Sequence, residues 1–241
     1  MKFLREHLYV ILIAIIAISA LAVSAMMIIS AFANTKPGPG LNETYVSVRF
    51  LGEDDEILLE KKVPQGAFAV PPVDIHLSGN QVMQGWYGSM LNVSSDSECR
   101  ISLRDIANET NVFYINTQYV PCNETFELDV RLGGNVNLSI IELTLPYDTQ
   151  SLKYESSSSR IGTVGKKDEG ELYFQLNNNK TINENTVLFS VRFRAVGNPF
   201  SYVELKPNIQ KAITRLANGT ETTDYQIIPA KLYLYDKEVS K

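Results

Sequence analysis

Strict alternation of apolar and polar side chains is the feature that most constrains how this chain folds. The alternation is clearest over residues 187–194, where valine and phenylalanine take every second position. A period of two places these side chains on one face of an extended segment and is typical of a half-buried β-strand. Further strands are expected at residues 45–50, 57–63, 111–115, 126–132, 138–145, 171–176, 202–206, 225–228 and 231–235. From residue 118 on, no window has sustained helical spacing, so the pattern predicts a mainly β protein that ends in a jelly-roll-like antiparallel β-sandwich.

The N-terminal segment differs from the rest of the chain because it has no charged side chain between Leu8 and Thr35. As a helix, residues 8–33 are long enough to cross a hydrocarbon core of about 30 Å. Lys2 and Arg5 precede this segment, and positive charge retained in the cytoplasm would place the rest of the chain outside. Two interpretations stay open, an uncleaved signal anchor and a signal peptide cleaved after Ala33. Both export residues 34–241, and the Pro/Gly-rich residues 34–42 are expected to form a linker.

Composition argues for binding rather than catalysis. The 241 residues carry a formal charge of −5, which is unsuited to nucleic acid, and their 44% apolar content is ordinary for a globular protein. Two Cys and two His are too few for a structural zinc cluster, and no motif places a nucleophile. We therefore expect no enzyme activity, no catalytic residue, no metal ligand and no cofactor.

Export makes Cys99 and Cys122 a candidate disulfide, because such bonds form in oxidising compartments. The bond would close a loop of roughly twenty residues and stabilise the fold by about 3 kcal/mol. Two free thiols are the alternative.

Asn-x-Ser/Thr sequons make surface N-glycosylation a further expectation in a host that has the enzymes, although an Asn-rich chain also produces sequons by chance. The seven sequons are at Asn42, Asn92, Asn108, Asn123, Asn137, Asn179 and Asn218.

The first exported segment carries an ordered series of short motifs. They are Val48-Arg49-Phe50, a polar turn at residues 53–56, Val63-Pro64-Gln65-Gly66, Pro71-Pro72, Gly85-Trp86-Tyr87 and Thr110-Asn111-Val112-Phe113-Tyr114. In this order and spacing, residues 43–117 resemble the Listeria–Bacteroides repeat, the β-grasp module of internalin-type surface proteins. The acidic, glycine-poor first turn departs from that family. The resemblance implies a small β-grasp domain that acts as a surface spacer or adhesive module.

A second set of motifs covers the C-terminal half. It comprises a strand at residues 124–130, a strand at 141–145, the turn from Tyr147-Asp148 to Leu152, and a late strand at 188–195. These features resemble the cohesin family, whose turn reads Y-D-x-x-x-L, and Thr149 departs from the proline usual there. Asp148 is suited to bond its own backbone amides, and Leu152 to enter the core. The resemblance implies a domain that binds a calcium-loaded dockerin module, and because the family's contact residues follow no short motif, none is transferred.

Several other features favour ordinary structural roles. The acidic residues 53–56 lack the ligand spacing of a calcium loop and are expected to form a solvated hairpin turn. Trp86 is expected in a small core, and His76 in a loop without a chemical role. The serine run at 156–159 and the asparagine run at 177–179 are expected to be loops.

The C-terminal strand leaves one question open. Either the leucines or the tyrosines of residues 232–235 face the interior. Outward tyrosines would form an aromatic recognition face. Its members would be Phe200, Tyr202, Tyr225, Tyr233 and Tyr235.

The expected organisation is a signal segment at residues 1–33, a linker at 34–42, a β-grasp module at 43–117 and a cohesin-like sandwich at 118–241. The expected function is an exported cell-surface binding or scaffolding protein, held on the outer face of the membrane by residues 8–33 with its C-terminus outside, or secreted if cleaved. Its expected partner is a dockerin-like protein module. The alternatives are a carbohydrate-binding module for surface polysaccharide and a purely structural surface-layer subunit.

Overall fold

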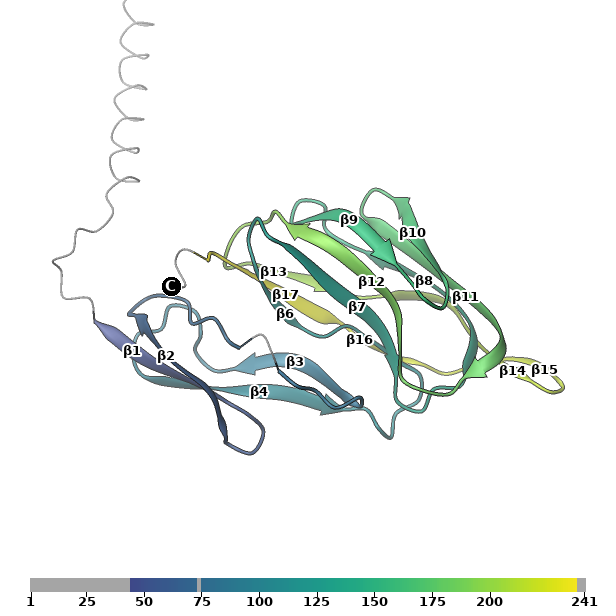
Figure 1. Cartoon of the computed structure of the whole chain (residues 1–241), viewed down its shortest axis with the longest axis horizontal. Coiled ribbons are helices and arrows are strands. Elements are labelled where there is room, and N and C mark those ends of the chain that lie inside the picture. The colour runs from purple at the N-terminus through teal and green to yellow at the C-terminus, as the bar shows by residue number, and fades with distance from the viewer. Residues whose placement is uncertain (1–43, 73–74, 238–241) are drawn as a thin grey trace, which may run out of the picture. The chain divides into compact units, whose positions relative to one another are not determined.

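Seventeen strands make up the regular structure of the described part of the chain, which the computed structural model gives as residues 44–72 and 75–237 (Figure 1). That part holds no helix with the length and apolar character needed to cross a membrane. The predicted membrane segment 8–33, the cleavage position at Ala33, the linker 34–42 and the sequon at Asn42 lie outside the described residues.

A four-stranded mixed sheet, here called the small sheet, comes first along the chain. Its strands are β1 (Tyr45–Leu51), β2 (Ile57–Pro64), β3 (Gln81–Tyr87) and β4 (Ser97–Asp105), in the order β2-β1-β4-β3. β1 pairs antiparallel with β2 and parallel with β4. The apolar face of the sheet buries Phe50 and Trp86, whose rings meet edge to face at 5.1 Å.

Two five-stranded sheets form the layers of a β-sandwich. The first, in the order β16-β5-β7-β12-β9, consists of β5 (Val112–Tyr114), β7 (Thr125–Gly133), β9 (Leu152–Ser158), β12 (Thr186–Ala195) and β16 (Gln226–Ile228). The second, in the order β10-β11-β8-β14-β15, consists of β8 (Leu138–Pro146), β10 (Thr163–Asp168), β11 (Glu171–Ile182), β14 (Asn208–Leu216) and β15 (Gly219–Thr222). A three-stranded sheet, β13-β17-β6, consists of β6 (Gln118–Pro121), β13 (Tyr202–Leu205) and β17 (Ala230–Tyr235). The prediction of a mainly β protein with a sandwich is confirmed.

The alternating apolar side chains of both layers meet in one hydrophobic core. Leu128 and Val130 enter it from β7, and Leu143 enters it from β8. Phe174 of β11 stacks on Phe189 of β12 across the layers, with 5.3 Å between the ring centroids. Burial of this apolar surface is the main term that holds the two sheets together.

Three segments differ from expectation. β5 pairs with β7 in the sandwich instead of closing the small sheet, so the sandwich begins before residue 118. Residues 156–158 of the serine run lie in β9, an edge strand paired with β12, and β11 continues through Asn177 as far as Ile182. Strand pairing joins backbone groups, so polar side chains on an exposed face do not prevent it.

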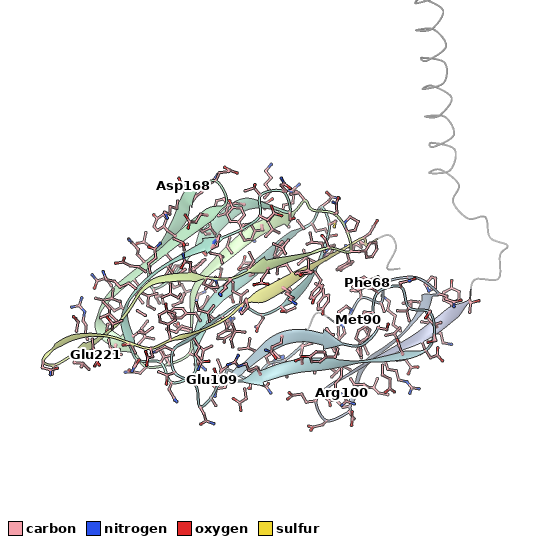
Figure 2. The ribbon with its side chains drawn as sticks, turned by 180° about the vertical axis from the view of Figure 1, so that it is seen from behind. Phe68, Met90, Arg100, Glu109, Asp168 and Glu221 are labelled. Carbon is pink, nitrogen blue, oxygen red and sulfur yellow. The ribbon has the colours of Figure 1, made fainter. Side chains whose placement is uncertain are left out.

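The apolar side of the small sheet packs against β6 and β17 of the sandwich. Figure 2 shows Phe68 and Met90 on this side of the sheet, and the Phe68 ring lies 5.7 Å from that of Tyr235. The Thr117 N–H donates to the Met83 carbonyl at 3.1 Å. Farther along the interface, Asn185 Nδ2 donates to the Gly79 carbonyl at 2.7 Å. The small sheet therefore covers part of the outer surface of the sandwich.

Candidate functional site

The first outer surface of the sandwich is a row of tyrosines, and the small sheet covers most of it. Leu232 and Leu234 point into the sandwich core, which answers the question that alternation left open. Tyr235 and Tyr119, both 8% exposed, pack into the core of the small sheet instead. This surface therefore serves largely as a contact within the chain.

One exposed aromatic group remains beside that contact. Tyr202 is 58% exposed, lies 6.0 Å from the Tyr233 ring, and has Lys231 Nζ 5.2 Å above its own ring. Phe200 and Tyr225 are also partly exposed, and they contact Phe68 and Phe113 respectively. The structure thus keeps a much smaller aromatic patch than the expected recognition face.

The second outer surface, formed by β7, β12 and β9, is charged. Arg192 pairs with Glu127 at 3.5 Å, and Arg194 pairs with Glu155 at 3.1 Å. Asp129 accepts hydrogen bonds of 2.6 Å from both Arg131 and Ser190. These groups already satisfy one another, so the surface is typical of a solvated sheet face.

The third outer surface belongs to the β10-β11-β8-β14-β15 sheet, and we call it the open face. Its outward side chains form three rows across the strands, because residues opposite each other in a ladder point to the same side. The rows are Gly165, Tyr173, Thr144 and Asn208; then Thr163, Gln175, Glu142 and Lys211; then Asn177, Ile140, Ile213 and Thr222.

The open face is mostly polar, and its large apolar side chains are Tyr173, Ile140 and Ile213. Ile140 and Ile213 are half-buried neighbours in one row, and Lys211 Nζ donates to Glu142 Oε1 at 3.0 Å in the next. Tyr173 lies over Gly165, where an added Cβ would come 3.0 Å from the ring. The face has only a shallow hollow of about 240 Å³, lined by Glu142, Thr144, Tyr173 and neighbouring side chains. Such a shape suits a protein surface better than a small molecule, which needs a deeper pocket.

The turn that carries the cohesin resemblance lies at the end of β8. Asp148 Oδ1 accepts from the Gln150 N–H at 2.9 Å, and its Oδ2 accepts from Ser151 Oγ at 2.5 Å. These bonds, chiefly that from Ser151, lower the pKa of Asp148 below its ordinary value. Tyr147 packs 4.9 Å from the Phe193 ring, and Leu152 is fully buried in the core. The turn thus anchors the start of β9 and has no exposed chemistry beyond its carboxylate.

The two cysteines are free thiols, so the predicted disulfide is absent from the structure. Cys99 is buried in the core of the small sheet, whereas Cys122 packs against the core of the sandwich. Different cores hold the two sulfur atoms, and sequence separation alone gave no sign of this. Burial raises the pKa of Cys99 to about 11 and also raises that of Cys122.

The described sequon side chains are all exposed and lie in turns or at strand ends. They are Asn92, Asn108, Asn123, Asn137 and Asn218. Asn179 lies within β11, and its side chain is not described. Asn137 Oδ1 accepts a hydrogen bond of 2.7 Å from the buried Asn111. Exposure makes these sites accessible to modification.

The acidic turn, the tryptophan and the histidine singled out in the sequence lie where an ordinary structural role was expected. The acidic residues 53–56 form the β1–β2 turn, where Asp55 pairs with Arg100. Trp86 is 8% exposed in the small core, and His76 is exposed in the loop before β3. Among residues 44–72 and 75–237, no group of three or more His, Cys, Asp or Glu side chains is placed to hold a metal ion.

No family model and no curated protein matches the chain, so the resemblance of residues 43–117 to the Listeria–Bacteroides repeat has no support from these comparisons. Solved structures do match, and those compared are cohesin domains.

The seventh type I cohesin of Pseudobacteroides cellulosolvens ScaB is 11% identical, with a TM-score of 0.48 over 52% of this chain and 92% of that one. The sixth cohesin of Acetivibrio cellulolyticus scaffoldin B, solved in complex with a dockerin, is 15% identical, with a TM-score of 0.46 over 52% and 99%. A non-cellulosomal cohesin from the archaeon Archaeoglobus fulgidus is 14% identical, with a TM-score of 0.44 over 54% and 94%.

Proposed function

We propose that this protein is a non-enzymatic binding or scaffolding protein whose sandwich recognises a partner protein module through the open face. The observation that carries the proposal is the state of the three outer surfaces among the described residues. The small sheet covers the tyrosine row, and the charged face is internally paired. The open face carries Tyr173 in one outer row and two half-buried isoleucines in the other, which are side chains able to anchor a protein contact, and a polar middle row separates them.

The partner class in this proposal is a dockerin-type module, as the resemblance of residues 118–237 to cohesins implies. The mixed character of the open face supports a reversible contact rather than a permanent one. An obligate interface would be larger and more apolar. Glu142 and Lys211 lie in the middle row, between the row of Tyr173 and the row of the two isoleucines. They would set the orientation of the partner through complementary charge.

Calorimetric titration of fragment 44–241 with a panel of dockerin modules, with and without calcium, tests this function. We expect Tyr173→Ala to weaken binding by about 2 kcal/mol, roughly thirtyfold, because truncation of the aromatic side chain on this face removes its contact area. Tyr202→Ala is the matched control, since that tyrosine is exposed on a different surface and should leave affinity unchanged. Failure of every dockerin to bind, or equal losses in the two variants, would contradict the proposal.

Carbohydrate binding is the second candidate, and the exposed Tyr202 beside Tyr233 and Lys231 favours it. An exposed aromatic ring can stack on the apolar face of a sugar. Retention of fragment 44–241 on insoluble polysaccharide, abolished by Tyr202→Ala and unaffected by Tyr173→Ala, would support this candidate over the first.

Export completes the proposal. Residues 8–33 would carry the chain across the membrane as an anchor or a cleaved signal, and the small sheet would act as a β-grasp spacer between membrane and sandwich. N-terminal sequencing of the mature protein tests this part. Cleavage after Ala33 or an intact start in the membrane fraction would agree with export, and recovery of an intact chain from the cytosol would refute it.

A further inference from the structure

The free edge of the small sheet is an eight-residue strand. β2 lies at one end of the order β2-β1-β4-β3, and among the described residues it pairs only with β1 (Figure 1). An edge strand presents backbone N–H and C=O groups that can pair with another chain. Natural edges usually block this with charges, proline or distortion along their length.

The protection of β2 is uneven. Ile57 is 56% exposed and Leu58 is 41% exposed at its start, while lysines and Pro64 occupy its second half. One half of the edge is therefore apolar and accessible, and the other half is basic. Between the two halves, Glu60 and Lys62 carry opposite charges two residues apart, so they can pair with each other when a second copy runs antiparallel.

Symmetry limits the registers that two copies can take. A two-fold axis that pairs identical strands antiparallel stands perpendicular to the sheet, so the same faces of the two copies must align. Residue numbers opposite each other then add to an even number. Among such registers, the one centred on Lys61 pairs residues 58–64 of both copies and places opposite charges at Glu60 and Lys62 against each other.

In this register each Glu60 lies opposite the other copy's Lys62 on the outer face of the sheet. The full set of cross-strand pairs is Leu58 with Pro64, Leu59 with Val63, Glu60 with Lys62, and Lys61 with itself. Leu59 and Val63 share the face that packs toward the sandwich, where Val63 is 2% exposed. Lys61 is on that same face, because Val48 opposite it in β1 is fully buried, so the two Lys61 side chains face one another between the Leu59 and Val63 positions. Their long stems allow the ammonium groups to diverge.

We propose that two copies of this chain associate by antiparallel pairing of their β2 strands, which joins two small sheets into one continuous eight-stranded sheet. The strand supplies backbone hydrogen bonds, and two Glu60–Lys62 pairs select the register. Glu60 takes part although it already accepts from Ser47 Oγ at 2.9 Å and lies 3.7 Å from Arg49, because a carboxylate has further acceptor sites. The open face lies on a different sheet, so this association is independent of partner binding.

Charge reversal on β2 tests the register directly. Sedimentation velocity of fragment 44–241 should show a dimer whose population rises with concentration. Glu60→Lys places lysine opposite Lys62, and Lys62→Glu places glutamate opposite Glu60, so each variant alone should be a monomer. An equimolar mixture of the two variants restores opposite charges at both positions and should form a heterodimer.

Glu184→Lys is the matched control, because this glutamate is exposed in the turn before β12 and should leave the dimer intact. Circular dichroism and thermal melting of each variant establish that it is folded. A wild-type fragment that stays monomeric up to its solubility limit would overturn the proposal. Single variants that remain dimeric, or a mixture that stays monomeric, would overturn it equally.

Discussion

Replacing Asn111 by alanine should remove a polar junction on which several segments of the fold depend. Asn111 is fully buried just before β5 and has a left-handed backbone, with φ of 48°. Its Nδ2 donates to Asn137 Oδ1 at 2.7 Å and to the Asp224 carbonyl at 3.0 Å. Its Oδ1 accepts from the Asn137 N–H at 3.0 Å. One side chain thereby joins the start of the sandwich, the β7–β8 turn and the segment that leads into β16.

The expected magnitude follows from these contacts. Three hydrogen bonds at roughly 0.5–1.5 kcal/mol each amount to about 3 kcal/mol. Alanine in the left-handed region adds about 1 kcal/mol, because it keeps the Cβ that approaches the following carbonyl oxygen but lacks the short polar side chain by which asparagine offsets this strain. We therefore expect Asn111→Ala to lower the free energy of unfolding by about 4 kcal/mol. For a fragment of this size, that corresponds to a fall in Tm of roughly 10 °C.

Urea and thermal unfolding of fragment 44–241 measure this loss. Asn111→Gly removes the same side-chain bonds but tolerates the backbone, so it should lose about 1 kcal/mol less than the alanine variant. Asn135→Ala is the matched control, since this asparagine is exposed in the neighbouring turn and should change stability by less than about 0.5 kcal/mol. A loss below about 1 kcal/mol for Asn111→Ala, or equal losses at both positions, would refute the reasoning.

Three further predictions concern other parts of the structure. A thiol assay on the denatured protein should count two free thiols per chain, and a count of zero would show a disulfide instead. In the native fragment at pH 8, an alkylating reagent should modify Cys122 before the buried Cys99. Gly134→Ala should lower the free energy of unfolding by about 3 kcal/mol or more in urea, because Gly134 has φ of +74° and the new Cβ would lie 2.3 Å from the Glu109 carbonyl oxygen. A variant of near-wild-type stability would contradict this geometry. Ser151→Ala should raise the pKa of Asp148 toward its ordinary 3.8 in an NMR titration. A lowered pKa in the folded state stabilises the fold only above the unfolded value, so the wild type should lose this contribution as the pH falls through the folded pKa. An unchanged Asp148 pKa would rule out the Ser151 hydrogen bond as the main cause of the lowered pKa.

Periodicity predicted the strands whose inner face is regular. β12 shows this best, since its apolar side chains alternate and point into the core, with Leu188 and Phe189 both buried at a bulge. β14 was missed for the opposite reason. A register shift between Ile209 and Lys211 breaks its period of two, so no apolar face is visible in the sequence.

Polar strands were missed because strands pair through backbone hydrogen bonds, which do not require a particular pattern of side chains. Ser156 and Ser158 of β9 face outward on an edge strand, and the serine run reads as a loop although its backbone pairs with residues 190–192 of β12. β5 was recognised as a strand, but its partner in β7 is not encoded in its three residues. The predicted boundary at residue 118 therefore cuts through the sandwich, and fragment 118–241 would lack β5 and expose the tyrosines that the small sheet covers.

The open face was the part of the candidate site that sequence reasoning could not assemble. Tyr173, Glu142 and Lys211 come from three strands, and only the register brings them together. The sequence predicted strands at residues 138–145 and 171–176. It gave no sign of which polar face the rest of the chain leaves uncovered.

NMR mapping of the contact surface tests the central claim most directly. Isotope-labelled fragment 44–241 would be titrated with a calcium-loaded dockerin module, and amide shift changes would be assigned along every strand. The account predicts changes concentrated on β8, β11 and β14, with β7, β9 and β12 unmoved. Changes confined to the charged face, or a spectrum that no dockerin alters, would contradict it.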